Sequence, residues 1–433
     1  MDDKSNKLLL VPVLAVLFVM IGYQYICPAD SSSCRLRSGP SSGAFRALLS
    51  AYSPEEDGGV DADTDADAEE VPATFPSKFN FTAEDLERRV EFDIKGSDVI
   101  VFLHIQKTGG TTFGRHLVRN IRLERPCDCR PGQKKCTCHR PGKAESWLFS
   151  RFSTGWSCGL HADWTELTSC VPAVMNKKQR KDAPLKRRNF YYITLLRDPT
   201  SRYLSEWKHV QRGATWKTAL HMCDGRPPTP AELPACYSSE DWTGVSLADF
   251  MSCPSNLANN RQTRMLADLS LVGCYNLSSM SEGRRAELLL ESAKRNLRHM
   301  AFFGLTEFQR KTQFLFERTF GLRFITPFTQ INSTRAASVA VEPAMRRRIE
   351  ALNVLDVQLY EYARELFLYR VQHCHQQDRL RDRERRREQR WRMREHRASQ
   401  RRQWKEQEVE EGEKVEGRRI GVTEDYSSQV MRW

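Results

Sequence analysis

The 433-residue sequence predicts one folded domain of the α/β class, with a central parallel sheet flanked by helices. Two continuous runs of β-branched and apolar residues, 99–105 (VIVFLHI) and 190–197 (FYYITLLR), have the pattern of buried parallel strands. Each run is followed at once by a turn and a helical stretch. Hydrophobic residues make up 40% of the chain, which excludes a wholly disordered protein.

The N-terminal part of the chain predicts a membrane anchor followed by a stem. After a short tail (residues 1–7), residues 8–26 form an apolar run that is long enough to cross a bilayer as a helix. No small-residue cleavage pattern follows Ile26, so an anchor is favoured over a cleaved signal peptide. Residues 27–78 are rich in Ser, Gly, Pro, Ala and acidic residues, which is typical of a flexible stem.

The run 99–105 leads into a Gly-rich turn that predicts a phosphate site. Gln106, Lys107 and residues 108–112 (TGGTT) follow the strand, and a helical stretch, 113–122, follows the turn. This order of elements places backbone N–H groups and the positive end of a helix around a phosphate. Because the lysine precedes the glycines, the segment is a P-loop-like strand-loop-helix and not a Walker A motif.

Sequons and cysteines favour a lumenal, disulfide-bonded domain, as in a type II membrane protein. The sequons begin at Asn80, Asn276 and Asn332. Eleven of the thirteen cysteines lie between Cys127 and Cys374, and an oxidising lumen would let them pair, with one left free or intermolecular. The segment 127–139 (CDCRPGQKKCTCH) also allows a zinc site. Disulfides are favoured there, because structural zinc usually has two or more residues between paired ligands.

The second run ends at Arg197, and residues 198–201 (DPTS) predict a turn that opens a helix. Ligands of open α/β sheets bind outside the carboxyl ends of the strands, which is where Arg197 falls. Ser205 lies about two turns into the predicted helix. Residues that follow it on the same face are His209, Arg212 and Trp216. The alternative is a structural role, with Arg197 paired to Asp198 and Ser205 capping or packing.

The C-terminal third predicts a long helix on the core and then a basic tail. The apolar residues at helical spacing are Ile349, Leu352, Leu355, Leu359, Tyr362 and Leu366. The folded domain is therefore expected to span residues 79–375, and the tail residues 376–433. Within the tail, residues 376–405 hold 13 Lys and Arg against 5 Asp and Glu without an apolar stripe. A solvated helical or disordered tail is favoured, and a helix that binds a polyanion or another partner is the alternative. Because residues 376–405 alone have an excess of eight positive charges, against a net charge of +12 for the whole chain, no nucleic-acid partner is predicted.

Together the two motifs resemble the nucleotide-binding signature of sulfotransferases that use 3′-phosphoadenosine 5′-phosphosulfate (PAPS). In that family a lysine in the strand-loop-helix holds the 5′-phosphosulfate, and an arginine at a strand end and a serine eight residues later hold the 3′-phosphate. Lys107, Arg197 and Ser205 match this pattern. Longer segments resemble the heparan sulfate 6-O-sulfotransferases, among them HIQKTGGTTFGRHLV, YYITLLRDPTSRYLSEWKHVQRGATWKT and FFGLTEFQRKTQFLFERTF. The resemblance runs from about Phe79 to Arg370.

The resemblance implies an enzyme of the Golgi membrane, with its catalytic domain in the lumen, that sulfates the 6-hydroxyl of glucosamine in heparan sulfate. It implies PAPS as co-substrate and no required metal, and it predicts no oligomeric state. The residues implied for PAPS are His104, Ile105, Gln106, Lys107, Thr108, Gly109, Gly110, Thr111, Thr112, Arg197, Ser205, Thr329, Gln330, Thr334 and Arg335.

His161, in the segment 155–164 (GWSCGLHADW), is the base that the resemblance implies, and Lys107 is its catalytic companion. The other histidines lie in the cysteine cluster, at or beyond the end of the domain, on the first helix pointing away from its mouth (His116), or in segments where no other polar groups converge (His221 and His299). His104 and His209 remain as competitors. The residues implied for the acceptor are Lys134, Lys135, Arg151, Trp156, His161, His209 and Trp216. The basic run 177–188 is an alternative polyanion surface, although a solvated loop is favoured there.

Two other functions remain compatible with the sequence. A nucleotide-dependent sugar kinase would share the strand-loop-helix, but it needs an acidic Mg²⁺ ligand on a second strand, for which Asp198 is the candidate. A non-catalytic, membrane-anchored protein that binds glycosaminoglycans would use the basic tail instead.

Overall fold

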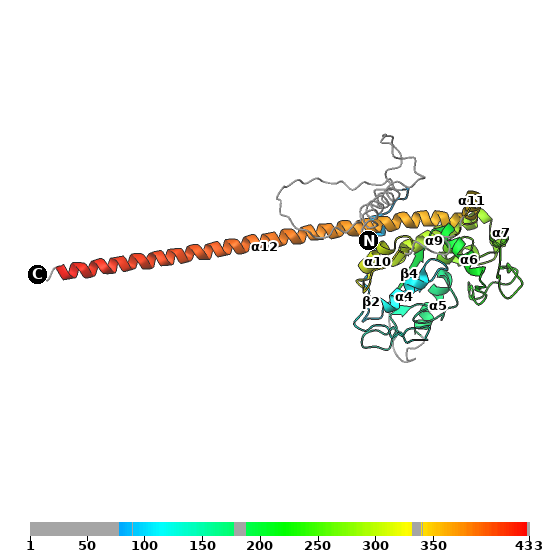
Figure 1. The fold of residues 1–433 in the computed structure, drawn as a ribbon, viewed down its shortest axis with the longest axis horizontal. Coiled ribbons are helices and arrows are strands. Elements are labelled where there is room, and N and C mark those ends of the chain that lie inside the picture. The colour runs from blue at the N-terminus through cyan, green and yellow to red at the C-terminus, as the bar shows by residue number, and fades with distance from the viewer. Residues whose placement is uncertain (1–77, 89, 177–187, 331–338, 340, 431–433) are drawn as a thin grey trace, which may run out of the picture. The chain divides into compact units, whose positions relative to one another are not determined.

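The computed structural model describes residues 78–88, 90–176, 188–330, 339 and 341–430, with side chains described as far as Val409. All of them belong to the unit that runs from Phe75 to Trp433 (Figure 1). The predicted anchor, the stem as far as residue 77 and the sequon at Asn332 lie outside the described residues. Within the described part of the chain, no helix is both long and apolar enough to cross a membrane.

The predicted parallel sheet is confirmed. Its four strands lie in the order β3–β1–β4–β5. The strands are β1 (Val99–Leu103), β3 (Leu148–Phe149), β4 (Phe190–Leu196) and β5 (Phe302–Leu305). All five residues of β1 are buried, and this burial on both faces explains why the strand is a continuous apolar run and not an alternating one. A separate antiparallel pair joins β2 (Ile121–Arg122) to β6 (Arg323–Phe324).

Helices flank the sheet, as the α/β pattern predicts (Figure 1). They are α3 (Ala83–Leu86), α4 (Gly110–Arg119), α5 (Trp164–Asn176), α6 (Pro199–Val210), α7 (Leu247–Ser252), α8 (Arg261–Leu266), α9 (Glu282–His299), α10 (Gln309–Phe320), α11 (Pro343–Leu352) and α12 (Val354–Val430), with 3₁₀ turns η1 (Leu269–Val272) and η2 (Leu277–Ser279). Helix α6 begins as predicted, because Asp198 Oδ1 accepts from Ser201 N at 2.8 Å and Pro199 occupies the first turn. Helix α4 begins at Gly110, three residues before the predicted start, because the Gly-rich turn itself supplies the first turn of the helix.

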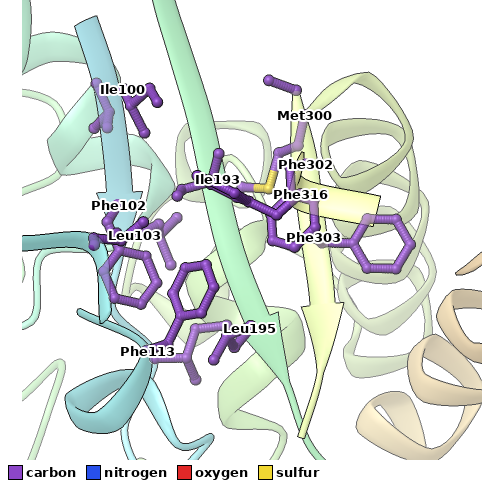
Figure 2. Packing of buried hydrophobic residues seen from close by; sticks show 14 of the residues in the cluster. Ile100, Phe102, Leu103, Phe113, Ile193, Leu195, Met300, Phe302, Phe303 and Phe316 are labelled. Atoms are coloured by element: carbon purple, nitrogen blue, oxygen red, sulfur yellow. The ribbon is translucent and has the colours of Figure 1, made fainter. Parts of the chain in front are cut away.

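The hydrophobic core lies on both faces of the sheet (Figure 2). On one face, the ring centroid of Phe302 lies 6.0 Å from that of Phe113 in α4 and 5.3 Å from that of Phe316 in α10. The next residue, Phe303, lies 6.2 Å from Phe367 of α12. Because successive side chains of a strand point to opposite faces, α12 covers the face opposite α4 and α10. Replacing one of these phenylalanines by Ala would cost about 3–5 kcal/mol of stability.

The predicted single C-terminal helix is wrong, because two helices meet at Asn353. Helix α11 ends at Leu352 and α12 begins at Val354. Asn353 is fully buried, its Oδ1 accepts from Asn260 N at 3.1 Å, and its Nδ2 donates to Ile349 O at 2.8 Å. Its side chain thus competes with the helical hydrogen bonds at this point. The apolar spacing of the sequence continues across the break, which is why the periodicity did not reveal it.

The cysteine cluster forms two nested disulfides, as favoured over a zinc site. Cys127 pairs with Cys138, and Cys129 pairs with Cys136. Between them, Asp128 N donates to Thr137 O at 2.9 Å and Thr137 N donates to Asp128 O at 2.8 Å. In a pair of extended segments, residues two positions apart point to the same face. Cys127 and Cys129 therefore face Cys138 and Cys136 on the opposite segment.

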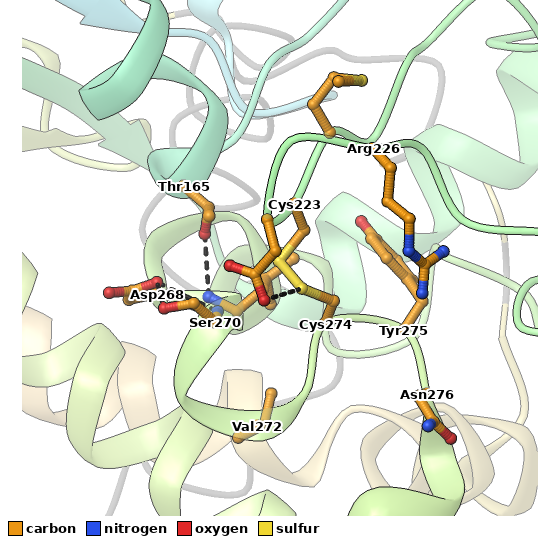
Figure 3. The surroundings of a disulfide bond; sticks show 12 residues. Thr165, Cys223, Arg226, Asp268, Ser270, Val272, Cys274, Tyr275 and Asn276 are labelled. Atoms are coloured by element: carbon orange, nitrogen blue, oxygen red, sulfur yellow. Dashed lines mark hydrogen bonds between the residues drawn. A yellow bond between two sulfur atoms is a disulfide. The ribbon is translucent and has the colours of Figure 1, made fainter.

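Three further disulfides join the segments around the sheet. They are Cys158–Cys170, Cys223–Cys274 and Cys236–Cys253, and Cys374 is free, in agreement with the odd count. Figure 3 shows Cys223–Cys274 between the loop that carries Arg226 and the segment that carries Tyr275. Within the described residues, the only His, Cys, Asp and Glu cluster close enough to share a metal ion is Cys223, Asp224 and Cys274. Its two sulfurs are bonded to each other, so it does not offer three ligands.

Candidate active site

Three loops meet at the carboxyl ends of β1, β4 and β5, where open α/β sheets bind their ligands. Thr306, directly after β5, donates its N–H to Leu196 O at 3.0 Å and its hydroxyl to Thr108 O at 2.6 Å. Arg197, directly after β4, donates Nη1 to Lys107 O at 3.3 Å. The loops that follow β4 and β5 therefore hold the turn that follows β1.

The turn between β1 and α4 has the backbone of an anion site. Lys107 and Gly109 have left-handed φ angles of 66° and 80°. Among the described residues no side chain caps the first turn of α4, so its leading N–H groups are open to a ligand. A Cβ on Gly110 would lie 2.3 Å from Cδ2 of His104, so only glycine fits while the imidazole keeps its place. The turn thus offers an anion amide donors, a positive helix end and the Lys107 ammonium.

His161 lies against this turn, and one of its two ring nitrogens is engaged in a hydrogen bond. Its Nδ1 lies 2.8 Å from the carbonyl oxygen of His104. A carbonyl only accepts, so Nδ1 carries the proton, and in the neutral ring Nε2 keeps a lone pair. Burial, together with the charges of Arg261 and Arg151, lowers the pKa of His161 to about 4, against the raising effect of the His104 hydrogen bond. At neutral pH the ring is therefore a proton acceptor at Nε2.

Aromatic rings form a wall around His161. The ring centroid of Trp156 lies 4.6 Å from that of His161, and Trp216 meets it edge-on at 6.3 Å. Behind Trp156, the buried His104 stacks on the indole at 5.9 Å. The guanidinium of Arg151 lies 5.2 Å from the Trp156 ring centroid. Trp156 is 37% exposed, so part of its indole is accessible beside the base, where a pyranose ring could pack.

A groove of about 730 Å³ opens next to this wall. It passes Gln106, Trp216 and Arg261 and continues to Trp242. Because Trp216 also contacts His161, the groove and the base are neighbours. Gln106 is buried, and among the described residues its Oε1 has no hydrogen-bond partner. An unpaired buried acceptor in the wall of a groove is a place for a ligand donor such as a hydroxyl.

Buried charges fix one wall of the groove. Glu206 of α6 accepts hydrogen bonds from Arg202 and from Arg261, whose Nε lies 2.8 Å from Oε2. Burial acts to raise the pKa of Glu206, but the charges of Arg261 and Arg202 outweigh it, so the pKa is lowered and the carboxylate stays ionised. The guanidinium of Arg261 in turn lies 5.3 Å from the ring centroid of Trp216. Trp216 is thus held in place by a charge that is itself fixed.

Most predicted site residues within the described part of the chain gather at this edge of the sheet. Those that form the turn and its surroundings are His104, Ile105, Gln106, Lys107, Thr108, Gly109, Gly110, Thr111, Thr112, Arg151, Trp156, His161, Arg197 and Trp216. The ring of His209 lies 5.9 Å from that of Trp216, and Ser205 is half-buried in α6. Gln330 Nε2 donates to Thr306 O at 3.4 Å.

The remaining predicted residues have looser or undescribed positions. The stem of Lys135 lies over Gly155, where an added Cβ would be 3.0 Å from Lys135 Cδ. Lys134 and Thr329 are exposed, and no contact within the described residues joins them to the site. Thr334 and Arg335 lie outside the described residues, as do residues 177–187 of the alternative basic run.

The predicted helical face through Ser205 is wrong beyond His209. Helix α6 ends at Val210, and a turn follows in which Gly213 has a φ of 82°. Arg212 and Trp216 therefore do not continue the face of α6. Trp216 reaches the site through the chain reversal after the helix and not through helical spacing.

Sequence reasoning missed four residues of the site. Arg261 and Glu206 shape the groove wall, and Gln262 binds the backbone of Arg197 through two hydrogen bonds. His221 is predicted from the sequence to lie where no other polar groups converge, yet it lines the groove, and burial with the charges of Arg264 and Arg261 lowers its pKa to about 3. These partners come from distant parts of the chain, so no local motif could have marked them.

The chain is similar to known proteins over nearly its whole length. The sequence profile described as "Sulfotransferase family" matches residues 90–363. The chain is 65% identical to heparan-sulfate 6-O-sulfotransferase 3-B of Danio rerio, with 100% of both chains covered. It is 58% identical to heparan-sulfate 6-O-sulfotransferase 3 of Mus musculus, again over 100% of both chains. Heparan-sulfate 6-O-sulfotransferase 2 of Gallus gallus is 63% identical over 390 residues, which are 90% of this chain and 92% of that one.

Proposed function

The chain belongs to the family of heparan-sulfate 6-O-sulfotransferases, and from this premise we propose that it transfers a sulfuryl group from PAPS to the 6-hydroxyl of glucosamine residues in heparan sulfate. A sulfotransferase needs a sulfuryl donor, groups that neutralise the leaving bisphosphate, an acceptor groove and a base for the acceptor proton. The carboxyl edge of the sheet offers candidates for the last three of these.

The turn after β1 is the proposed donor site. PAPS, when bound, supplies the activated sulfuryl group. Amides and hydroxyls of residues 108–112 surround its 5′-phosphate, and Lys107 neutralises charge on the bridging oxygen. Arg197 and Ser205 hold the 3′-phosphate, while Thr329, Gln330, Thr334 and Arg335 close over the nucleotide. The hydrogen bond from Arg197 to the carbonyl of Lys107 supports this assignment, because it joins the two phosphate positions in one structure.

His161 is the proposed base. The acceptor oxygen bonds to sulfur, the bond from sulfur to the bridging oxygen breaks, and the proton of the hydroxyl passes to Nε2 of His161. The observation that carries the proposal is the hydrogen bond from Nδ1 to the His104 carbonyl beside the Gly-rich turn. It fixes the ring orientation and the tautomer in which Nε2 can accept a proton.

The groove and its basic surroundings are the proposed acceptor site. Heparan sulfate is a polyanion, so Lys and Arg would pair with its sulfates and carboxylates, and indole faces would receive its sugar rings. The assigned residues are Lys134, Lys135, Arg151, Trp156, His161, His209 and Trp216. The groove of about 730 Å³ beside Trp216 is large enough for a few sugar units.

Incubation with PAPS labelled in its sulfuryl group, heparan sulfate and excess EDTA tests the proposal. We expect label on the polysaccharide, at the 6-position, without any added metal. A sugar kinase would transfer no sulfur label and would need Mg²⁺ and ATP. A purely binding protein would retain the chain unlabelled, and either result would refute the proposed function. The Lys107→Ala chain serves as the inactive control.

We further propose a type II arrangement in the Golgi membrane. Residues 1–7 would be cytoplasmic, residues 8–26 the anchor, residues 27–78 the lumenal stem, residues 79–375 the catalytic domain and residues 376–433 the tail. The five disulfides found among the described residues support an oxidising compartment. Deletion of residues 1–75 behind a cleavable signal should give a secreted, active protein, and loss of folding would show that the stem belongs to the domain.

A further inference from the structure

Helix α12 continues well beyond the part that packs on the sheet. Asp378 still pairs with Arg318 of α10 at 3.1 Å. From Arg379 to Val409 every side chain of the helix is exposed. The proposed catalytic site uses none of these residues, so their pattern calls for an explanation of its own.

Most basic residues on this exposed part of the helix lie in one stripe, which we call the arginine stripe. Its members are Arg379, Arg383, Arg386, Arg390, Arg394, Arg397 and Arg401, followed by Lys405. Each lies three or four residues from the next, which is the spacing of neighbours on one helix face. The positions also repeat every eleven residues, as in Arg379, Arg390 and Arg401. Eleven residues are close to three whole turns, so the stripe runs nearly straight along the helix. It extends over about 40 Å at roughly 1.5 Å per residue.

Acidic residues near this stripe pair with arginines that are not members of it. Asp378 pairs with Arg381 at 3.9 Å, Glu388 pairs with Arg392 at 2.8 Å, and Asp382 pairs with Arg385. All three arginines in these pairs lie off the stripe. Within the described residues, no member of the stripe has an ion-pair partner. A helix that is merely solvated gains from alternating charges around its whole surface, whereas this one leaves eight like charges in a row.

We propose that the arginine stripe is a second binding site for the polysaccharide, one that holds the sulfated chain along helix α12 away from the catalytic groove. The inference rests on the proposed function for the identity of the ligand. Guanidinium groups pair with sulfate and carboxylate through two parallel hydrogen bonds. A row of them about 40 Å long matches a linear polyanion better than a compact one. Bound anions would also relieve the repulsion among neighbouring arginines.

The stripe gives long chains an advantage that short ones lack. A chain that spans both the groove and the stripe is held at two sites, so release from one leaves it tethered by the other. A hexasaccharide that fills the groove has little chain left to reach the stripe. The two substrate lengths therefore separate the two sites.

Two variants of the full-length chain, each with four positive charges removed, test the proposal. The stripe variant is R383Q/R390Q/R394Q/R397Q, and the matched control is R381Q/R385Q/R392Q/R402Q, whose residues lie off the stripe. Circular dichroism first checks that both keep the helix content of the wild type. Binding of long heparan sulfate chains and of a heparan hexasaccharide is then measured without PAPS.

We expect the stripe variant to bind the long chain about fivefold or more weakly, with the loss shrinking in high salt, and to bind the hexasaccharide like the wild type. The control should keep at least most of its affinity for the long chain. Equal losses in both variants would show a net-charge effect, and no loss in the stripe variant would leave the stripe without a role. Tighter binding of duplex DNA than of heparan sulfate by the wild type would assign the stripe to another ligand. Each of these three results overturns the proposal.

The same samples keep this proposal apart from the proposed function. Transfer of sulfuryl label to the hexasaccharide reports the catalytic site alone, and the stripe variant should match the wild type in it. Absent transfer in all samples, with selective loss of long-chain binding in the stripe variant, would refute the enzyme and leave the polysaccharide site standing. Normal transfer, together with unchanged long-chain binding in the stripe variant, would support the enzyme and refute the second polysaccharide site.

Discussion

Gln262 and Arg197 form a closed pair of hydrogen bonds. Oε1 of Gln262 accepts from Arg197 N at 2.9 Å, and Nε2 donates to Arg197 O at 3.0 Å. Arg197 is the first residue after β4, where the hydrogen bonds of the sheet have ended. The side chain of Gln262 therefore binds both its N–H and its C=O. Gln262 is itself buried, and its own N–H donates to Asp356 Oδ2 at 3.1 Å. A buried network therefore sets the direction in which Arg197 leaves the strand.

Gln262→Ala should weaken nucleotide binding, because Gln262 positions Arg197 although it does not contact the nucleotide itself. The change leaves the N–H and C=O of Arg197 unpaired, at a cost of about 1–3 kcal/mol of stability for each group. Calorimetry with adenosine 3′,5′-bisphosphate should show a loss of about tenfold or more, which corresponds to about 1.4 kcal/mol, while KM for the oligosaccharide changes little.

The control for this positioning role is Asn296→Ala. Asn296 also donates to a buried backbone carbonyl, that of Leu266 at 2.8 Å, at the other end of α8. It should lower stability by a similar amount and leave nucleotide affinity unchanged. If both variants lose affinity in proportion to stability, Gln262 has a purely structural role.

Arg197→Ala and Ser205→Ala should remove recognition of the 3′-phosphate alone. A charge-assisted hydrogen bond contributes about 1.5–3 kcal/mol, so wild-type protein should prefer adenosine 3′,5′-bisphosphate to adenosine 5′-phosphate by at least about tenfold. In each variant this preference should shrink while affinity for adenosine 5′-phosphate stays the same. Equal weakening of both nucleotides would place these residues elsewhere in the site.

His161→Ala should abolish transfer while nucleotide binding persists, because a base acts on the acceptor and does not hold the donor. General-base catalysis contributes at least about a hundredfold, so the rate with saturating substrates should fall by that factor or more. His299→Ala, at an exposed position of α9, is the matched control and should keep the wild-type rate. A His161→Ala chain that retains more than about a tenth of the rate would contradict the assignment.

The strands and the phosphate turn could be predicted because their signals are local. The buried run 99–105 and the glycines that follow it belong to one stretch of sequence, and the need for glycine at Gly110 arises from His104, six residues earlier. The break at Asn353 depends on a side chain that bonds Asn260, far away in sequence. His221 reaches the groove on a segment held by the disulfide Cys223–Cys274, which closes a separation of 51 residues. Long-range partners of this kind leave no periodic or motif signal in a single sequence.

The pH dependence of stability should carry the signature of His161. Its pKa is about 4 in the folded protein against 6.5 for a free histidine, so between these values the unfolded chain binds a proton that the folded chain does not. The free energy of unfolding should therefore fall as the pH drops from 6.5 towards 4, and this group should add nothing above 6.5. Asp163 on the same loop acts in the opposite sense, because burial and the charge of Glu166 raise its pKa and its contribution to stability is lost as the pH rises.

Denaturant unfolding of wild type and of His161→Ala across pH 4 to 8 should show a shallower acid slope in the variant. An unchanged slope in His161→Ala would mean that the ring is already protonated in the folded protein below pH 6.5.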